Sequence, residues 1–374
     1  MINIYYGPTD EYKEFIDIKV NENILSLNNI LEIMKENKNE ELESKYDKLV
    51  IYENEYSFLS EAGQNMILYI LKISFKKYHI KEVYMQNPTK QIKSLIINNI
   101  DVNHINIKTY EYKKVENDVL IEITEKFNDK ILFQESVKEN LEIVLYHILK
   151  RRNKGKPIVL MFFGESGVGE TETAKYIGSL LGGNIMRVQM SMFQSSTYLD
   201  YLSGSEHNNK SFSRDLLNRK TNIVLLDEFD KTNYSIVSLF YQAFDEGIFS
   251  DLNYDVNLND LVFICTTNFL SEKEIRSSLG DPMFYRFDEL IKFEKIEKQE
   301  IDSLISTIVK RQIEYLDDSE KIVLKESEFD DNISKLTYIL IKNFENITIN
   351  FRVITKMIVR EIEKILVKEY LAKL

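Results

Sequence analysis

A glycine-rich loop constrains the fold of this chain more than any other segment. The residues Gly164-Glu165-Ser166-Gly167-Val168-Gly169 follow the apolar run IVLMFF at 158–163 and precede a helical pattern at 171–181. A strand, a glycine loop and a helix in this order are typical of a phosphate-binding loop. The glycines let backbone N–H groups turn inward, and the start of the helix adds positive partial charge. We therefore predict an α/β fold with an anion site at this loop.

The two residues after the loop fit this pattern unequally. Thr171 stands where the pattern has a Ser or Thr that binds Mg²⁺, but Glu170 stands where it has a Lys that contacts the phosphates. A pair of unit charges about 4 Å apart, at an effective dielectric near 20, is worth about 4 kcal/mol. Losing that attraction alone weakens binding on the order of a thousandfold. Lys175 lies further along the helix, away from the loop, and does not replace the missing charge.

Polar residues follow two further apolar runs. NIVLLDEFDK at 222–231 places Asp227 and Glu228 at the carboxyl end of a predicted strand, beside the phosphate loop. Asp227 is expected to hold Mg²⁺ through water, and Glu228 to polarise an attacking water. The run LVFICTTN at 261–268 ends in Asn268, which can orient that water. Taken alone, Asn268 is better explained as a turn-forming residue at an ordinary strand end.

Two arginines further along are candidate contacts for phosphate. Arg286 lies among aromatic residues in PMFYRFDELIKF at 282–293, where a lone Arg usually forms a surface salt bridge. In a ring of subunits, it can instead reach the γ-phosphate of a neighbour. Arg352 begins a predicted helix in INFRVITKMIVREI at 349–362, from which it can contact phosphate across a cleft.

The order of these motifs resembles that of an AAA+ ATPase of the Clp unfoldase type, over residues 125–374. GESGVGETETAK resembles Walker A, LLDEFDK Walker B, CTTN sensor 1, FYRFDELIKF the arginine-finger segment and NFR sensor 2. SLFYQAFDEGIFSD resembles the helix and turn that follow Walker B. DKILFQESV resembles the segment that precedes the core in this family, with Phe133-Gln134 in place of a Gly-Gln pair.

The resemblance implies ATP and Mg²⁺ as cofactors, a homo-oligomeric ring that is usually hexameric, and remodelling of a protein client. By the resemblance, the catalytic residues would be Glu228, Asn268, Arg286 and Arg352, and the metal ligands Thr171 and Asp227. The nucleotide-binding residues would be Gly164, Glu165, Ser166, Gly167, Val168, Gly169, Glu170, Thr171 and Glu172, with Ile131 and Leu132 lining the adenine pocket.

The sequence departs from the family at two places. Glu170 is either an inactivating substitution in a working enzyme or a natural change in a degenerate subunit, and the retention of the other site residues favours the first. The stretch 201–220 lacks a Gly-Tyr-Val-Gly pore loop. Tyr201, His207 and Phe212 are candidates to replace it, although each is as simply explained by packing or by a loop. Threading of a client is therefore not predicted.

We predict three domains: an N-terminal α/β recognition domain at 1–115, a P-loop α/β core at 125–295 and a helical lid at 296–374. In the first, apolar runs typical of strands alternate with helical patterns, which favours a small α/β sandwich with a parallel sheet; the runs lie at 2–6, 48–53, 81–86 and 105–110. We expect this domain to recruit a protein partner. The last domain shows helical patterns at 298–316, 332–344 and 351–374.

Composition excludes several classes of protein. A net charge of −12 disfavours a nucleic-acid-binding or membrane-surface protein. Cys265 is the single cysteine, so no internal disulfide or Cys-based zinc site is possible, and the four scattered histidines do not suggest a metal site. The N-terminus shows no signal-peptide pattern, and the apolar runs are too short to span a bilayer. We expect a cytoplasmic protein.

Two other functions stay open on the sequence alone. A non-catalytic AAA+ scaffold would use nucleotide structurally or not at all. A nucleic-acid-linked loader or defence ATPase is a further alternative, which the acidic balance and the Clp-like motifs disfavour.

Overall fold

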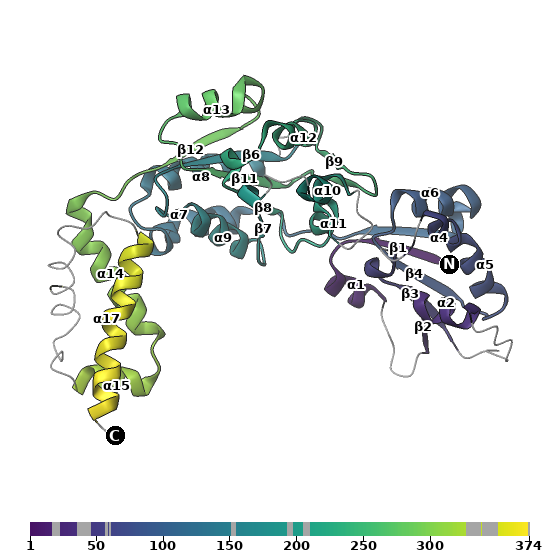
Figure 1. Cartoon of the computed structure of the whole chain (residues 1–374), viewed down its shortest axis with the longest axis horizontal. Coiled ribbons are helices and arrows are strands. Elements are labelled where there is room, and N and C mark those ends of the chain that lie inside the picture. The colour runs from purple at the N-terminus through teal and green to yellow at the C-terminus, as the bar shows by residue number, and fades with distance from the viewer. Residues whose placement is uncertain are drawn as a thin grey trace.

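The computed structural model describes a chain organised in three units. The described residues are 1–16, 23–35, 46–56, 59, 61–150, 155–192, 197–204, 210–326, 338 and 351–372. The ribbon in Figure 1 is elongated and curved, with an N-terminal unit (residues 2–109) at one end, a helical unit (298–372) at the other and a P-loop unit (117–293) between them. None of the helices within the described ranges is long and apolar enough to cross a membrane.

The N-terminal unit is built on a parallel sheet with the strand order β2-β3-β4-β1-β5. The strands are β1 (Ile2–Tyr6), β2 (Ile24–Ser26), β3 (Lys48–Ile51), β4 (Glu82–Gln86) and β5 (Ile105–Thr109). The helices are α1 (Thr9–Ile16), α2 (Leu27–Lys35), α3 (Glu53–Tyr56), α4 (Glu61–Asn65), α5 (Ile67–Lys76), α6 (Lys90–Asn99) and the short η1 (Val102–His104). The predicted α/β fold with a parallel sheet is confirmed.

Two local sequence patterns in this unit predict the structure incorrectly. The apolar spacing of ILSLNNILEIM at 24–34 predicts a helix, but its first three residues form β2, because Ile24 pairs with Lys48 of the neighbouring strand. Tertiary pairing here overrides the helical spacing. Pro88 suits the first turn of a helix, but α6 begins after Thr89, whose side chain caps it by accepting from Ile92 N–H at 3.3 Å.

The P-loop unit contains a second parallel sheet, with the order β12-β6-β11-β8-β7. Its strands are β6 (Ile158–Gly164), β7 (Met186–Gln189), β8 (Ile223–Asp227), β11 (Val262–Thr267) and β12 (Glu289–Phe293). Every residue of β6, β8 and β11 is buried, as expected where helices cover both faces of a parallel sheet. Of these strands, β12 was not predicted.

Helices and a hairpin surround this sheet. The helices are α7 (Asn117–Lys130), α8 (Glu135–Leu149), α9 (Glu170–Leu180), α10 (Thr197–Ser203), α11 (Phe212–Leu217), α12 (Tyr234–Glu246) and α13 (Glu272–Phe284), with the short η2 (Met190–Met192) and η3 (Phe229–Lys231). The hairpin pairs β9 (Ile248–Ser250) with β10 (Asp255–Asn257). The amphipathic pattern of residues 133–152 predicts one long helix, but α8 begins only at Glu135, because Phe133 has a φ of +57°, outside the helical region.

The helical unit follows β12 directly. It comprises η4 (Lys298–Glu300), α14 (Ile301–Tyr315), α15 (Asp318–Glu326) and α17 (Phe351–Ala372). Buried aliphatic residues of α14 and α17 form its core, among them Leu304, Ile308, Ile354 and Ile358. The helix predicted at 332–344 lies outside the described residues except for Tyr338.

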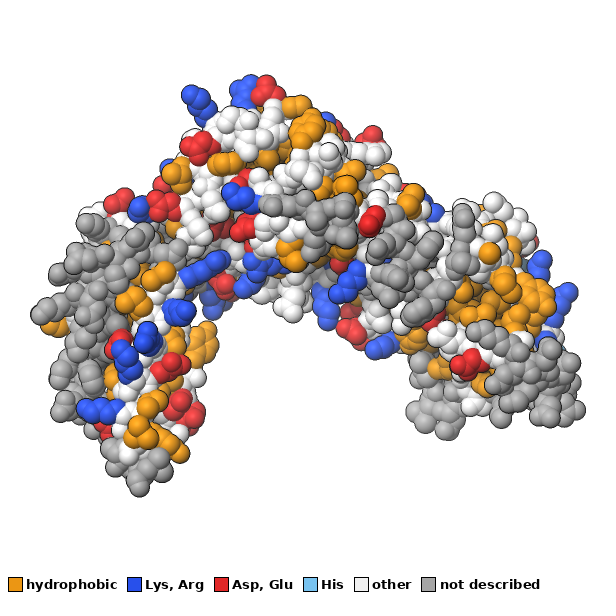
Figure 2. Space-filling view, in the orientation of Figure 1, with side chains coloured by type: hydrophobic (Ala, Val, Ile, Leu, Met, Phe, Trp, Pro, Cys, Tyr) orange, Lys and Arg blue, Asp and Glu red, His pale blue; other side chains and the backbone are white. Residues whose placement is uncertain are grey.

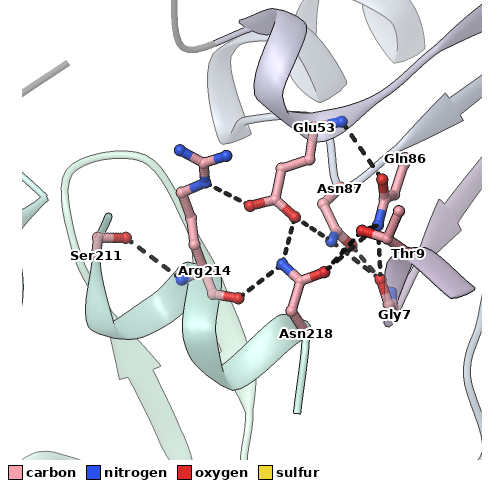
Figure 3. A network of polar contacts seen from close by, with 8 residues as sticks. All are labelled: Gly7, Thr9, Glu53, Gln86, Asn87, Ser211, Arg214 and Asn218. Atoms are coloured by element: carbon pink, nitrogen blue, oxygen red, sulfur yellow. Dashed lines mark hydrogen bonds and ion pairs between the residues drawn. The ribbon is translucent and has the colours of Figure 1, made fainter. Parts of the chain in front are cut away.

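A buried polar cluster joins the N-terminal unit to α11 and the residue that follows it (Figure 3). The Glu53 carboxylate accepts from Arg214 Nε, from Asn218 Nδ2 at 2.6 Å and from Asn87 Nδ2 at 2.6 Å. Only 6% of the Glu53 side chain and 15% of the Arg214 side chain are exposed. We call these four residues the interdomain clamp.

Candidate nucleotide-binding site

The glycine loop takes a backbone path that only glycine accommodates well. Gly167 and Gly169 have φ values of +84° and +126°, in the region where other residues are strained. At Gly164, an added Cβ atom would lie 2.5 Å from the carbonyl oxygen of Phe293 in β12, so the loop passes too close to the edge strand for a side chain. The loop therefore joins β6 to α9 in the geometry that the sequence predicted.

A cavity of about 280 Å³ lies beside this loop. The sequence-predicted residues that line it are Ser166, Gly167, Glu170, Thr171, Asp227, Glu228, Asn268 and Arg352. They come from the loop, from the carboxyl ends of β8 and β11, and from the first turn of α17. Residues far apart in the sequence thus meet at one anion-sized pocket, at the sheet edge where parallel α/β proteins bind ligands.

Glu170 is buried within this pocket, with 8% of its surface exposed. Burial raises the pKa of its carboxyl above the usual value, and the nearby negative charge of Asp227 acts in the same direction. The Glu170 and Gly169 backbone groups and the charge of Arg352 lower the pKa in part. A carboxylate therefore occupies the place that the sequence pattern reserves for a cation.

Asp227 is fixed by a hydroxyl from the adjacent strand. Thr266 donates from Oγ1 to Asp227 Oδ1 at 2.6 Å and accepts from the Glu228 backbone N–H at 2.9 Å. Glu228 itself has a φ of +55°, a left-handed conformation that this hydrogen bond supports. Because β11 lies between β6 and β8, Thr266 links the two acidic residues to the central strand of the site.

Arg187, on β7, is a member of the pocket that the sequence did not reveal. Its guanidinium forms an ion pair with Asp227, with Nε 3.1 Å from Oδ2, and its side chain is 45% exposed. Gln189 from the same strand also lines the cavity. The alternation of apolar residues with Arg187 and Gln189 in IMRVQM was a usable signal, but interpreting it requires knowing that β7 lies beside β8.

The pocket offers suitable ligands for Mg²⁺ but an unsuitable contact for the phosphates of ATP. The Thr171 hydroxyl and the Asp227 carboxylate are suitable ligands for Mg²⁺ together with phosphate oxygens and water. Glu170 does not fit the phosphate, because its carboxylate repels an anion at that position. No group of three or more acidic, His or Cys side chains forms a metal site within the described part of the chain.

Arg286 lies outside this cavity. Its guanidinium binds Asp245 Oδ2 from Nη2 at 2.6 Å and from Nε at 3.0 Å, and it stacks on the Tyr241 ring at 4.5 Å. The salt bridge foreseen for a lone arginine is therefore present.

The remaining predicted residues lie around the site. Ile131 is buried in the P-loop unit and lines a groove of about 880 Å³ beside α14 and α17, whereas Leu132 packs on the core of the helical unit. Val168 is buried, Glu165 pairs with Lys295 at 3.0 Å, and exposed Glu172 pairs with Lys175 at 3.6 Å.

Gln134 ties the phosphate loop to the segment that follows β12 and leads to the helical unit. Its Oε1 accepts from Glu294 N–H at 3.0 Å, and its Nε2 donates to the Glu294 carbonyl at 2.8 Å. Its Nε2 also lies 3.4 Å from the Val168 carbonyl. The preceding Phe133 has positive φ, which explains why a Gly-Gln pair suits this turn.

Two of the three candidate pore residues are engaged in packing. Phe212 is fully buried in the core of the P-loop unit, and Tyr201 donates its hydroxyl to Asp215 at 2.6 Å. His207 lies outside the described residues. In this structure, Tyr201 and Phe212 are therefore engaged in contacts within their own subunit.

Comparison with known families agrees with the geometry of this pocket. Residues 156–316 match the family described as AAA domain (Cdc48 subfamily). Over this range the chain therefore resembles an AAA domain, and the relatives that it matches are Clp proteins. The matched range covers the glycine loop, the acidic residues after β8 and the Asn268 segment.

Curated relatives of this chain are chaperones and protease subunits. The chain is 27% identical over 279 residues to the chaperone protein ClpB of Malacoplasma penetrans, an alignment that covers 66% of this chain and 38% of the relative. It is 25% identical over 225 residues to the Clp protease ATP-binding subunit ClpL of Staphylococcus aureus, covering 52% and 31%. The chain thus spans about two fifths or less of the length of each of these two relatives.

A solved structure shares the AAA+ fold. The closed-state Hsp104 complex with ATPγS and FITC-casein superposes with a TM-score of 0.57 at 13% sequence identity, over 99% of this chain and 88% of that chain. The α/β core with helical parts is therefore consistent with the AAA+ fold.

Proposed function

We propose that this chain is a Clp-like AAA+ subunit that binds ATP–Mg²⁺ weakly and remodels a protein partner, with hydrolysis suppressed by Glu170. The supporting observation is the 280 Å³ cavity that gathers Thr171, Asp227, Glu228 and Arg352 around Glu170. We further propose the domains 1–115, 125–295 and 296–374, and a cytoplasmic location.

The charge balance of the pocket supports weak binding. Glu170, Asp227 and Glu228 contribute carboxylates, and the cations are Arg187 and Arg352. In the pattern with lysine at 170, one acid would be replaced by a cation, a change of two charge units. Each pair of unit charges about 4 Å apart contributes about 4 kcal/mol at an effective dielectric near 20, so the phosphates meet a large unfavourable change.

The other side chains of the pocket suit the proposed chemistry. When bound, Mg²⁺ would offset phosphate charge, with Thr171 and Asp227 as its protein ligands. Glu228 would accept a proton from water, and Asn268 would orient that water; both line the cavity. Arg352 would stabilise charge on the phosphate from the helical unit.

Arg187 must share Asp227 with the metal in this proposal. Its ion pair occupies Asp227 Oδ2, while Thr266 occupies Oδ1. An arginine on the acidic ligand partly offsets the carboxylate of Glu170, which keeps the acidic pocket stable without nucleotide. We therefore expect ligand-free protein to be folded and the Arg187 side chain to move when Mg²⁺ binds.

A ring assembly completes the proposal. Arg286 is held by Asp245 within its own subunit, and only a neighbouring copy can present its phosphate to this arginine. In the proposed homo-oligomer, the N-terminal unit recruits the protein client.

Nucleotide binding and turnover by Glu170→Lys test the proposal. The variant is expected to bind ATP–Mg²⁺ on the order of a thousandfold more tightly than the parent and to gain ATP turnover. Glu170→Gln, the matched control, removes the negative charge without adding a cation and should fall between the two. Adding Glu228→Gln to the Lys variant should abolish turnover while leaving binding.

If Glu170→Lys binds nucleotide no better than the Gln control and shows no turnover, Glu170 is not what suppresses activity. The non-catalytic scaffold then becomes the better proposal. A parent chain that assembles into rings without nucleotide and still acts on its partner would favour the same alternative.

A further inference from the structure

A second cavity, of about 490 Å³, lies between the N-terminal and P-loop units. One wall comes from the carboxyl ends of β1 and β5 and from α6, and the other from the end of α11 and from the hairpin strand β10. Its volume falls in the range of small-molecule sites, about 300–1,000 Å³. The carboxyl edge of a parallel sheet is where open α/β folds bind their ligands.

The cavity is positively charged in a protein of net charge −12. Its lining includes Lys90, Lys93 and Arg219 against the single carboxylate of Asp255. Lys90 forms an ion pair with Asp255 at 3.0 Å, and Lys93 lies 5.5 Å from the centre of the Tyr6 ring. The remaining excess of positive charge is concentrated where a ligand can reach it.

Arg219 is the strongest sign of a missing anion. Only 7% of its surface is exposed, and its Nη1 and Nη2 donate to the Leu216 carbonyl at 2.6 Å and to Asn222 Oδ1 at 3.1 Å. Its Nε is buried without a hydrogen-bond partner, and among the residues that the structure describes no carboxylate pairs with it. Burial lowers the pKa of this guanidinium, and a buried charge without a counter-ion is costly.

Aromatic side chains surround these cations. The Arg219 guanidinium stacks on the Tyr112 ring at 4.0 Å, and Tyr6 and Tyr254 also line the cavity. Gly7 also lines the cavity. An added Cβ at Gly7 would lie 2.5 Å from Tyr110 Cβ, so the β1–α1 turn packs closely against the segment after β5. Cations and rings together suit a phosphorylated small molecule.

The interdomain clamp leaves Arg219 available for this role. Figure 3 shows Arg214 pointing toward Glu53, and the ion pair between them already neutralises this arginine. Asn218 joins the same cluster at 2.6 Å from Glu53 Oε2. Arg219, the next residue, turns instead to Tyr112 on the cavity side.

We propose that this interdomain cavity binds a small phosphorylated molecule, held by Lys93 and Arg219. Because its walls come from both units, the ligand would contact the N-terminal sheet and the P-loop unit at once. This cavity is separate from the nucleotide pocket beside Glu170, and the proposal does not depend on ATP binding in that pocket.

Calorimetric titration of the full chain with pyrophosphate tests the proposal. Lys93→Gln should weaken binding about tenfold or more, since it removes one charge-assisted contact. Arg219→Gln should weaken it at least as much. Lys76→Gln, an exposed lysine on α5 away from the cavity, is the matched control and should bind as the parent does.

A crossed variant separates the two pockets. Arg352→Gln alters the nucleotide pocket only, so pyrophosphate binding to the interdomain cavity should persist in it. If binding is lost in Arg352→Gln and unchanged in Lys93→Gln, pyrophosphate occupies only the nucleotide pocket and the proposal is wrong. Absence of any pyrophosphate binding would overturn it as well. Because Arg219→Gln removes two structural hydrogen bonds, the Lys93 variant carries the test if that protein does not fold.

Discussion

The interdomain clamp offers a sharp test of how the N-terminal unit is held. In Arg214→Met, the Glu53 carboxylate stays buried and keeps only its two amide donors, Asn87 and Asn218. Removing one partner of a buried ion pair costs about 3–5 kcal/mol, because the other charge is left uncompensated. The two remaining hydrogen bonds place this variant at the lower end, about 3 kcal/mol.

Proteolysis reports this loss directly. Trypsin can cleave after Lys113 and Lys114, in the segment that joins the two units. When opening is fast relative to cleavage, the rate follows the open population, so about 3 kcal/mol raises it on the order of a hundredfold. The double variant Glu53→Met, Arg214→Met should recover much of the loss, since it removes both charges.

A surface ion pair provides the control. Arg276 and Asp281 are 48% and 59% exposed, so Arg276→Met should change the free energy of unfolding by at most about 1 kcal/mol and leave cleavage of the connecting segment unaltered. Cleavage of Arg214→Met within about threefold of the parent rate would show that the clamp does not hold the units together. A double variant as readily cleaved as Arg214→Met would show that the buried charge is not the cause.

Three further outcomes follow from individual residues. The folded-state pKa of Glu170 is raised, so its ionised form destabilises the fold near neutral pH; Glu170→Gln should raise the melting temperature at pH 7, and this gain should vanish as the pH falls below 4.5, while a pH-independent gain would contradict the reasoning. Burial raises the pKa of Cys265, so its thiol should react with a disulfide reagent only after urea unfolding; prompt reaction in native protein would contradict its burial. At Gly247, φ is +67° and an added Cβ would overlap the Gly155 carbonyl oxygen, so Gly247→Ala should lower the free energy of unfolding in urea by about 2 kcal/mol or more. Gly183→Ala should lower it less, because Gly183 is not among the glycines with positive φ. Equal losses in the two variants would refute the argument.

The predictable parts of the site are those with strong local patterns. The loop at 164–169 and the acids after β8 each adjoin a run of buried residues, so sequence alone located them. Their meeting in one cavity followed from the rule that carboxyl ends of parallel strands share an edge. The identity of the family rested on the order of those motifs and is confirmed by the comparisons.

Features that depend on sheet order were not predictable. Arg187 reaches Asp227 only because β7 is the neighbour of β8, and no local pattern states which strands pair. The clamp joins Glu53 to Arg214 across 161 positions of sequence. Strand β12 was missed because its exposed Lys292 and partly exposed Glu289 weaken the apolar signal, although its pairing with β6 is complete.

Surface charge is likewise set by the fold. Figure 2 shows Lys and Arg side chains interspersed with Asp and Glu along the inner side of the curved body, rather than an unbroken basic face. A net charge of −12 could have concealed such a face. The visible side therefore carries charges of both signs.

Gln134 forms hydrogen bonds with both backbone groups of Glu294 and so anchors this residue to the P-loop unit. If the helical unit rotates against the sheet, we expect the backbone to bend in the few residues between Glu294 and η4. Lys295, the first of them, is tethered to Glu165 of the glycine loop. A movement of that loop would therefore change a contact of the segment that carries the helical unit.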